Sequence, residues 1–255
     1  MAAENNSFDA IVVGTGISGG WAAKELTEKG LKTLVLDRGR MVEHGDYPTT
    51  SDHLWELPYA GRPTQEDGQQ QMVAQRSGAL SQATKHWFVN DVDHPYVEKQ
   101  PFAWIRGYHV GGRSIMWGRQ SYRWGPMDFE ANAKDGVGVD WPIRYQDLAP
   151  WYDHVESFIG VSGQAEGYEQ LPDGKFLPPM ALNCVELHLK QALADKLGRA
   201  LTIGRTANLT APLAHSPQRG TCQYRNLCWR GCPFGAYFSS NSSTLPAAEK
   251  TGNMT

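Results

Sequence analysis

The chain has 255 residues, 40% hydrophobic and 20% charged, which is enough to bury a core as one large domain or two smaller ones. A formal net charge of −3 gives no electrostatic reason to expect a nucleic-acid partner. No stretch approaches the roughly 18 apolar residues of a membrane span, and residues 1–10 lack the basic and apolar regions of a signal peptide. Localisation stays open, as cytoplasmic or as periplasmic by export with a partner that carries the signal.

The first predicted unit is a strand, a glycine turn, a helix and a second strand. Residues 8–13 form a short apolar run, and the turn GTGISG follows at once. Helical periodicity then continues to Gly30, after which KTLVLD reads as a buried strand ending at Asp37. The turn contains three glycines in GxGxxG spacing: Gly14, Gly16 and Gly19.

This βαβ unit is typical of dinucleotide-binding proteins. Gly14 would allow the tight turn, Gly16 would let the backbone approach a pyrophosphate, and Gly19 would permit close packing of helix on strand. The phosphates would lie at the helix N-terminus, and Asp37 would accept hydrogen bonds from ribose hydroxyls. The alternative is an ordinary tight strand-to-helix connection. The pattern does not choose between NAD and FAD.

The alternation of strands and helices stops after the second strand. Residues 40–105 are rich in Pro, Gln, His and Trp, which indicates a large insertion and argues against an NAD-dependent dehydrogenase. The stretch HVGGRSIMWGRQSYRW follows at 109–124 and combines glycines, whose backbone no side chain covers, with aromatic and hydroxyl side chains. A large flat cofactor would require such a combination. An arginine- and tryptophan-rich surface loop is the alternative. Four arginines could instead bind FAD phosphates or an anionic substrate: Arg106, Arg113, Arg119 and Arg123.

The segments VVGTGISGG…LVLDRG, HVGGRSIMWGRQSYRW and WPIRYQDLAPWYDHVE together resemble the glucose–methanol–choline (GMC) oxidoreductases. The form VGGRSIMW is most similar to the sugar-oxidising branch, which includes pyranose oxidases and fructose, gluconate and glucoside 3-dehydrogenases. Pyranose oxidases place a flavin-linked histidine where this chain has Met116, so the resemblance implies non-covalent FAD.

The resemblance implies an α/β fold with a Rossmann-like FAD-binding domain of the glutathione reductase type, inserted loops and the start of a substrate domain. Residues 1–160 would form the FAD domain with its insertion and flavin-contacting loop. Residues 161–255 would form the start of a substrate domain, truncated, with the cysteine-containing segment. The cofactor-binding candidates are Gly14, Gly16, Gly19, Asp37, Arg38, Gly111, Gly112, Ser114, Trp117 and Gly118.

The implied function is an FAD-dependent oxidoreductase that acts on CH–OH groups of sugars or polyols and passes electrons to a non-NAD acceptor. A small or cytochrome subunit could serve as acceptor or export partner. In the family the histidine that takes the alcohol proton lies in a further half-length of protein, so no catalytic residue is assigned and the chain is expected to be a fragment. The alternative is a truncated, inactive FAD-binding remnant.

Three of the four cysteines crowd into one short segment: Cys222, Cys228 and Cys232. Their spacing is wider than in common zinc sites, and Cys184 is too distant in sequence to count on as a fourth ligand. Three thiolates could hold an iron–sulfur cluster, which fructose and glucose dehydrogenases of the resembled family carry near this place. The alternative is a set of buried thiols in a glycine turn.

Two further elements are predicted nearer the C-terminus. Pro142 precedes a helix whose apolar positions recur at helical spacing, so they are expected to face the core. These positions are Leu148, Trp151, Tyr152, Val155 and Ile159. The histidines His154 and His188 are expected to be surface or structural residues. Residues 241–255 read as a helix followed by a glycine turn.

Overall fold

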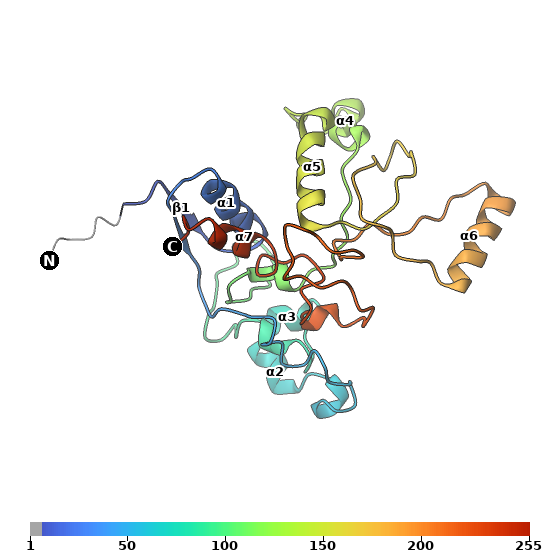
Figure 1. Cartoon of the computed structure of the whole chain (residues 1–255). Helices are drawn as coiled ribbons and strands as arrows, with labels where there is room; N and C mark the ends of the chain where they lie inside the picture. Colours follow the sequence, from blue (N-terminus) through green and yellow to red (C-terminus); the bar gives the residue numbers. More distant parts are fainter. Residues whose placement is uncertain (1–6) are drawn as a thin grey trace. The chain divides into compact units, whose positions relative to one another are not determined.

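The computed structural model describes residues 7–255, which form two compact units (Figure 1). Unit 1 comprises the chain up to Trp117 together with residues 224–235 and 239–255, and unit 2 comprises residues 118–223 and 236–238. The expected functional division between residues 160 and 161 stays a prediction, since compact units and functional domains need not share boundaries. The stretch considered for a signal peptide lies partly outside the described residues.

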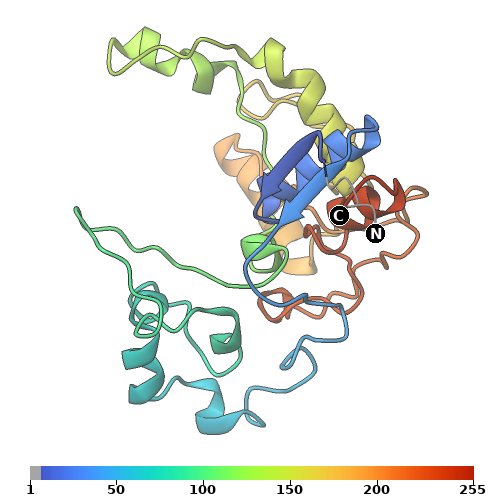
Figure 2. The same cartoon turned by 90° about the vertical axis from the view of Figure 1, so that its left-hand side faces the viewer.

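Unit 1 is built on a parallel sheet, which confirms the predicted α/β class. Strand β1 (Ala10–Val13) pairs with β2 (Thr33–Leu36) in parallel, and helix α1 (Ile17–Glu28) connects them (Figure 2). The last residues of the chain add to the other side of β2, because the amide of Thr33 donates to Asn253 O (2.8 Å) and that of Val35 to Thr255 O (2.8 Å). The glycine turn expected near the end is therefore followed by strand pairing that the sequence pattern did not predict.

Helix α7 (Thr244–Lys250) packs against α1 (Figure 1), and the contact requires a bare backbone on α1. A Cβ on Gly20 would lie 2.6 Å from Thr244 Oγ1 and 2.8 Å from Ser240 Oγ. Apolar side chains of β1 remain exposed, with Ile11 at 63% and Val13 at 82%.

The insertion after β2 folds into short helices around a buried aromatic cluster. Helices α2 (Gln65–Gln70) and α3 (Met72–Arg76) lie within it, and 3-10 turns occur at Pro58–Gly61, Lys85–Trp87, Gly112–Ile115 and Cys228–Arg230 of unit 1. The buried cluster comprises Val42, Tyr47, Ala74, Leu80, Trp87, Phe88, Ile115 and Met116. Met116, at the position where the resemblance would place the flavin-linked histidine of pyranose oxidases, is thus a core residue.

Unit 2 contains helices α4 (Pro126–Asp135), α5 (Tyr145–Ile159) and α6 (Cys184–Leu197). Helix α5 follows Pro142 as predicted and buries Ile159, but the expectation that Trp151 faces the core is wrong, because this side chain is 61% exposed. The buried polar residue of α5 is Glu156, which pairs with Arg123. Within residues 7–255, no helix is long and apolar enough to cross a membrane.

Candidate cofactor-binding site

The GTGISG turn has an open side and a closed side. Gly14 has φ +92°, a left-handed conformation that favours glycine. A Cβ on Gly19 would lie 1.8 Å from Gly14 O, so α1 can approach the turn this closely only because Gly19 has no side chain. At Gly14 and Gly16, by contrast, no described atom lies within 4 Å of the Cβ position. The open side can therefore accept a bound group.

The N-terminus of α1 lies beside this open space. Gly16 is the N-cap and makes no side-chain cap hydrogen bond, and the first turn of the helix contains no acidic residue. The first N–H groups of a helix lack partners within the helix, and the helix dipole favours negative charge there. An uncapped N-terminus beside open space fits the pyrophosphate of a dinucleotide such as FAD.

Asp37, at the end of β2, is bonded to the turn. Its Oδ2 accepts hydrogen bonds from the backbone N of Thr15 (2.6 Å) and from the Thr15 hydroxyl, and its Oδ1 accepts from the backbone N of Arg38 (2.5 Å). A carboxylate has about four acceptor positions, so about one remains for a ribose hydroxyl. The Arg38 guanidinium lies 3.9 Å from the centre of the Tyr108 ring.

The second predicted segment meets the first at this turn. The backbone N of Gly111 donates to Thr15 Oγ1 (2.8 Å), and a Cβ on Gly112 would lie 3.3 Å from the Cα of Gly16. Both Gly111 (φ +88°) and Gly112 (φ +49°) have left-handed conformations. The structure thus brings together most of the cofactor-binding candidates: Gly14, Gly16, Gly19, Asp37, Arg38, Gly111, Gly112 and Ser114.

The remaining candidates of this segment differ in their surroundings. Ser114 is fully buried, and its hydroxyl donates to Gly111 O (2.5 Å) and accepts from the backbone N of Ser240 (2.9 Å). The Ser114 hydroxyl proton is therefore used in a hydrogen bond within the second glycine segment and does not face open space. Trp117 is half-buried in unit 1, whereas Gly118 is exposed and belongs to unit 2.

A third segment, far along the chain, was missed by the sequence analysis. Ser240 Oγ donates to Gly16 O (3.1 Å), and Asn241 Nδ2 donates to Val42 O (3.0 Å) and Val110 O (3.1 Å). These two residues therefore connect both glycine segments. Asn241 also lines a hollow of about 480 Å³ in unit 1, and its buried Oδ1 has no described hydrogen-bond partner. The only local signal was the Ser-rich stretch SSNSST, which does not indicate contact with either segment.

Two of the four candidate arginines are neutralised by carboxylates within their own unit. Arg106 pairs with Asp91 (2.9 Å). Arg123 is buried, and its Nε lies 2.9 Å from one oxygen of Glu156 while NH2 lies 2.6 Å from the other. Burial opposes the charge on Arg123, but the hydrogen bonds to Glu156 and to neighbouring groups outweigh it and raise the pKa of Arg123. These two arginines are structural cations, which disfavours a role in binding phosphate or an anionic substrate.

The other two arginines lie over aromatic rings. Arg113 lies 5.6 Å from the centre of the Phe88 ring, and burial lowers its pKa. Its NH1 is buried and has no described hydrogen-bond partner. In unit 2, Arg119 lies 5.4 Å from the centre of the Tyr237 ring.

His109, the first residue of the second glycine segment, is buried, and the half-buried His86 lies near it; the sequence analysis singled out neither. His109 packs edge-on against Trp87 with ring centres 5.4 Å apart, and His86 lies 4.5 Å from the same ring. Burial lowers the pKa of His109, and burial together with the charges of Arg40 and His109 lowers the pKa of His86 to about 4. Both imidazoles are therefore neutral at pH 7.

The three clustered cysteines form no disulfide and are divided between the two units. Cys228 and Cys232 belong to unit 1 and Cys222 to unit 2, where Asn208 Nδ2 lies 3.8 Å from the Cys222 sulfur. In the part of the chain that the structure describes, no three His, Cys, Asp or Glu side chains are gathered to hold a metal ion.

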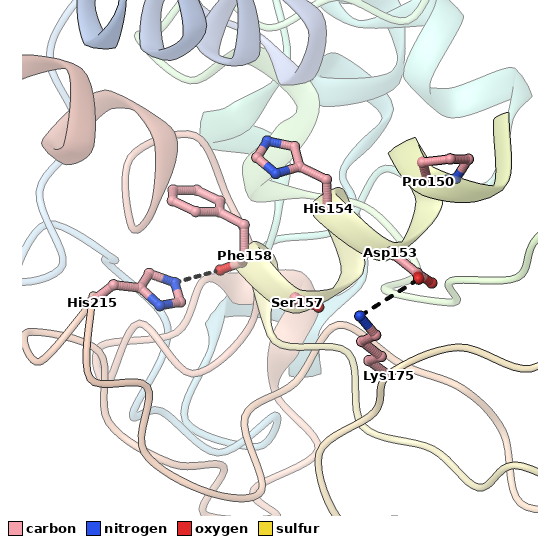
Figure 3. Close-up of a pocket in the computed structure, with 7 residues that line it drawn as sticks. All are labelled: Pro150, Asp153, His154, Ser157, Phe158, Lys175 and His215. Carbon is pink, nitrogen blue, oxygen red and sulfur yellow. Dashed lines mark hydrogen bonds and ion pairs between the residues drawn. The ribbon is translucent and has the colours of Figure 1, made fainter. Parts of the chain in front are cut away.

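A separate hollow of about 600 Å³ lies in unit 2 beside α5 (Figure 3). The His215 ring stacks on Phe158 with centres 5.1 Å apart, and His215 Nε2 lies 2.9 Å from Phe158 O. Lys175 Nζ lies 3.9 Å from Asp153 Oδ2. None of the predicted site residues lines this hollow.

The chain is similar in sequence to curated oxidoreductases of sugars and alcohols. No family model matches it. It is 27% identical to the fructose dehydrogenase large subunit of Gluconobacter japonicus over 99% of this chain and 45% of that protein. It is 27% identical to the gluconate 2-dehydrogenase flavoprotein of Pantoea cypripedii, over 97% of this chain and 43% of that protein. It is 26% identical to paromamine 6'-oxidase of Streptomyces fradiae, over 88% of this chain and 35% of that protein.

These curated relatives are GMC-type oxidoreductases, which confirms the resemblance predicted from the glycine segments. The chain spans less than half the length of each of them. A solved structure of pyridoxine 4-oxidase from Mesorbium loti aligns with 98% of this chain and 42% of its own length, at 15% identity and a TM-score of 0.46.

Proposed function

We propose that this chain is the FAD-binding portion of an oxidoreductase that oxidises a CH–OH group of a sugar or polyol and passes the electrons to an acceptor other than NAD. The observation that carries the proposal is the convergence of the two glycine segments at the uncapped N-terminus of α1, where Gly112 approaches Gly16 and Gly111 bonds to Thr15. The similarity to fructose dehydrogenase and gluconate 2-dehydrogenase supports a sugar or sugar-acid substrate class.

The residues of this chain would bind and orient the cofactor. FAD, when bound, supplies the capacity to accept two electrons from the alcohol carbon. The Gly14–Gly16 backbone and the first N–H groups of α1 would hold the pyrophosphate, and Asp37 would hold a ribose hydroxyl. Gly111, Gly112 and Trp117 would lie along the flavin. We assign the removal of the alcohol proton to no described residue.

The proposal extends to an electron-accepting partner. The relative from Gluconobacter japonicus is named as a large subunit, which implies further subunits in that enzyme. By analogy, a small or cytochrome subunit would accept the electrons here and could also bring a signal for export. Co-purification of the whole protein with a redox-active subunit would support this partner.

The iron–sulfur cluster stays a separate proposal, and its support is the closeness in sequence of Cys222, Cys228 and Cys232 together with the resemblance to dehydrogenases that carry such a cluster near this place. Iron analysis of anaerobically purified whole protein, with Cys228→Ser as comparison, tests it. Iron bound in the wild type and lost in the variant would support thiolate ligands. Iron-free protein that still reduces an artificial acceptor would favour three structural thiols.

The test of the proposed function uses Gly16→Val in the whole protein. Gly16 has φ −59°, which any residue adopts, and no described atom lies within 4 Å of its Cβ position, so valine would enter the open space without striking the fold. We expect the variant to fold but to lose the flavin absorbance and sugar-dependent dye reduction. Gly68→Val in helix α2, where a Cβ would make only ordinary contacts of 3.5 Å or more with the Gln75 side chain, is the control. Full FAD content in Gly16→Val would contradict the assigned site.

A further inference from the structure

Thr15 lies in the middle of the first glycine segment and is almost fully buried, at 4% exposure. Two of its hydrogen-bond donors are directed at Asp37. The backbone N of Thr15 lies 2.6 Å from Asp37 Oδ2, and the Thr15 hydroxyl donates to the same oxygen. A carboxylate accepts hydrogen bonds and has none to donate. The direction of the hydroxyl proton is therefore fixed toward Asp37.

The same hydroxyl also receives a hydrogen bond from the other glycine segment. With its proton directed to Asp37, the Thr15 oxygen offers a lone pair to the backbone N of Gly111, which lies 2.8 Å away and 96 positions later in the chain. The result is a continuous chain of hydrogen bonds from Gly111 N–H through the Thr15 hydroxyl to the Asp37 carboxylate. Hydrogen bonds in such a chain strengthen one another.

Only a small side chain that both donates and accepts can make this connection. Valine has nearly the shape of threonine, but it would leave the buried Gly111 N–H without a partner and would remove one donor from Asp37. The Gly111 backbone is also packed closely against the third segment, since a Cβ there would lie 1.6 Å from Asn241 Oδ1. Thr15 thus holds Asp37 and Gly111 in one arrangement.

We propose that Thr15 is a positioning residue whose hydroxyl couples the two glycine segments and thereby sets the affinity for FAD. The inference rests on the proposed function. It adds a residue that would contact the cofactor only through Asp37 and Gly111. Its hydroxyl, rather than its volume, is the property that matters.

The test measures the dissociation constant of FAD from the whole protein by the fluorescence of released flavin. We expect Thr15→Val to weaken FAD binding about tenfold or more, equivalent to about 1.4 kcal/mol, and Thr15→Ser to retain wild-type affinity. The matched control is Thr27→Val on α1, which removes a buried hydroxyl bonded only to Ala23 O (2.8 Å) and Lys24 O (3.1 Å) of its own helix. Thr27→Val is expected to change stability but not FAD affinity.

The outcomes separate this inference from the proposed function. A wild-type protein that binds no FAD overturns both. FAD binding that is equal in wild type and Thr15→Val overturns only the role of Thr15, as does an equal loss in Thr15→Ser and Thr15→Val. If Thr15→Val does not fold, Thr15→Ala, which has no steric demand, replaces it. Failure of both to fold beside a folded Thr15→Ser would show that the hydroxyl serves the fold, and would also overturn the proposal.

Discussion

The substitution Gly19→Ala tests how closely α1 is held against the first turn. The added Cβ would lie 1.8 Å from the carbonyl oxygen of Gly14, 2.8 Å from its carbon and 3.5 Å from Val12 Cγ1. The added Cβ is attached to the backbone of α1, and the atoms that it meets belong to the backbone of Gly14. Neither backbone can move aside as the end of a side chain could. The helix and the turn would have to separate by more than about 1 Å, which is a severe case of overpacking.

The expected cost is at the upper end of the overpacking range, about 3 kcal/mol. For a protein of this size, that cost corresponds to a fall in melting temperature of roughly 6–12 °C. Thermal unfolding should be recorded on protein stripped of FAD, so that loss of cofactor does not contribute to the shift. Gly45→Ala, whose Cβ position meets no described atom within 4 Å, should remain within about 0.5 kcal/mol of wild type. A Gly19→Ala melting temperature equal to that of the control would refute the reasoning.

Three other predictions concern the Arg123–Glu156 ion pair, the imidazole of the half-buried His86 and the exposed side chains of strand β1. Arg123→Met should destabilise the protein to urea by about 3–5 kcal/mol, because it leaves Glu156 buried without its partner; an unchanged unfolding midpoint would count against a buried pair. Because the pKa of His86 is lowered to about 4, the unfolded chain binds this proton first, so stability should fall as pH drops from about 6.5 to 4, and His86→Gln should reduce that fall when melting is compared at pH 7 and pH 5. The 255-residue chain alone should aggregate through the exposed β1 face, and Val13→Lys should increase its soluble fraction on centrifugation; equal solubility would show that this face is not responsible.

The sequence predicted those parts of unit 1 whose causes are local. The strand, glycine turn and α1 follow from residues that are neighbours in the chain, and so does the end of α1 near Gly30, which has φ +83°. The helix in 244–250 was also predicted, but its packing on α1 was not. That contact depends on Gly20 and Thr244, which are far apart in sequence and carry no pattern that pairs them.

On α5 the sequence predicted the helix and the burial of Ile159, but it was wrong about Trp151 and did not predict the burial of Glu156. Apolar spacing placed Trp151 toward the core, whereas the structure buries Glu156 and leaves Trp151 largely exposed. The reason is the buried Arg123, which requires a carboxylate partner and obtains a bidentate one from Glu156. Periodicity counts apolar residues and cannot detect a charge that is buried by its partner from another segment.

The same limit applies to the candidate site. GxGxxG spacing identified Gly14, Gly16 and Gly19, but Thr15 occupies a variable position of that pattern, so the pattern assigns it no role. Its importance arises from a contact with Gly111 that exists only after the long insertion has folded and returned to the turn. Residues that join two motifs belong to neither motif, and single-sequence reasoning therefore misses them.

The surroundings of the glycines bear on the choice that the sequence left open between a dinucleotide turn and an ordinary tight connection. A tight connection needs glycine only where backbones crowd, as at Gly19 and Gly111, where an added Cβ would lie within 2 Å of a protein oxygen. It gives no reason for glycine at Gly16, whose φ of −59° suits any residue and whose Cβ position meets no described atom within 4 Å. Since glycine at a helix N-cap stabilises the helix less than Ser, Asp or Asn would, its presence there is better explained by a group that must approach the backbone. The side of the turn that the protein leaves bare is thus the side on which the cofactor is proposed to bind.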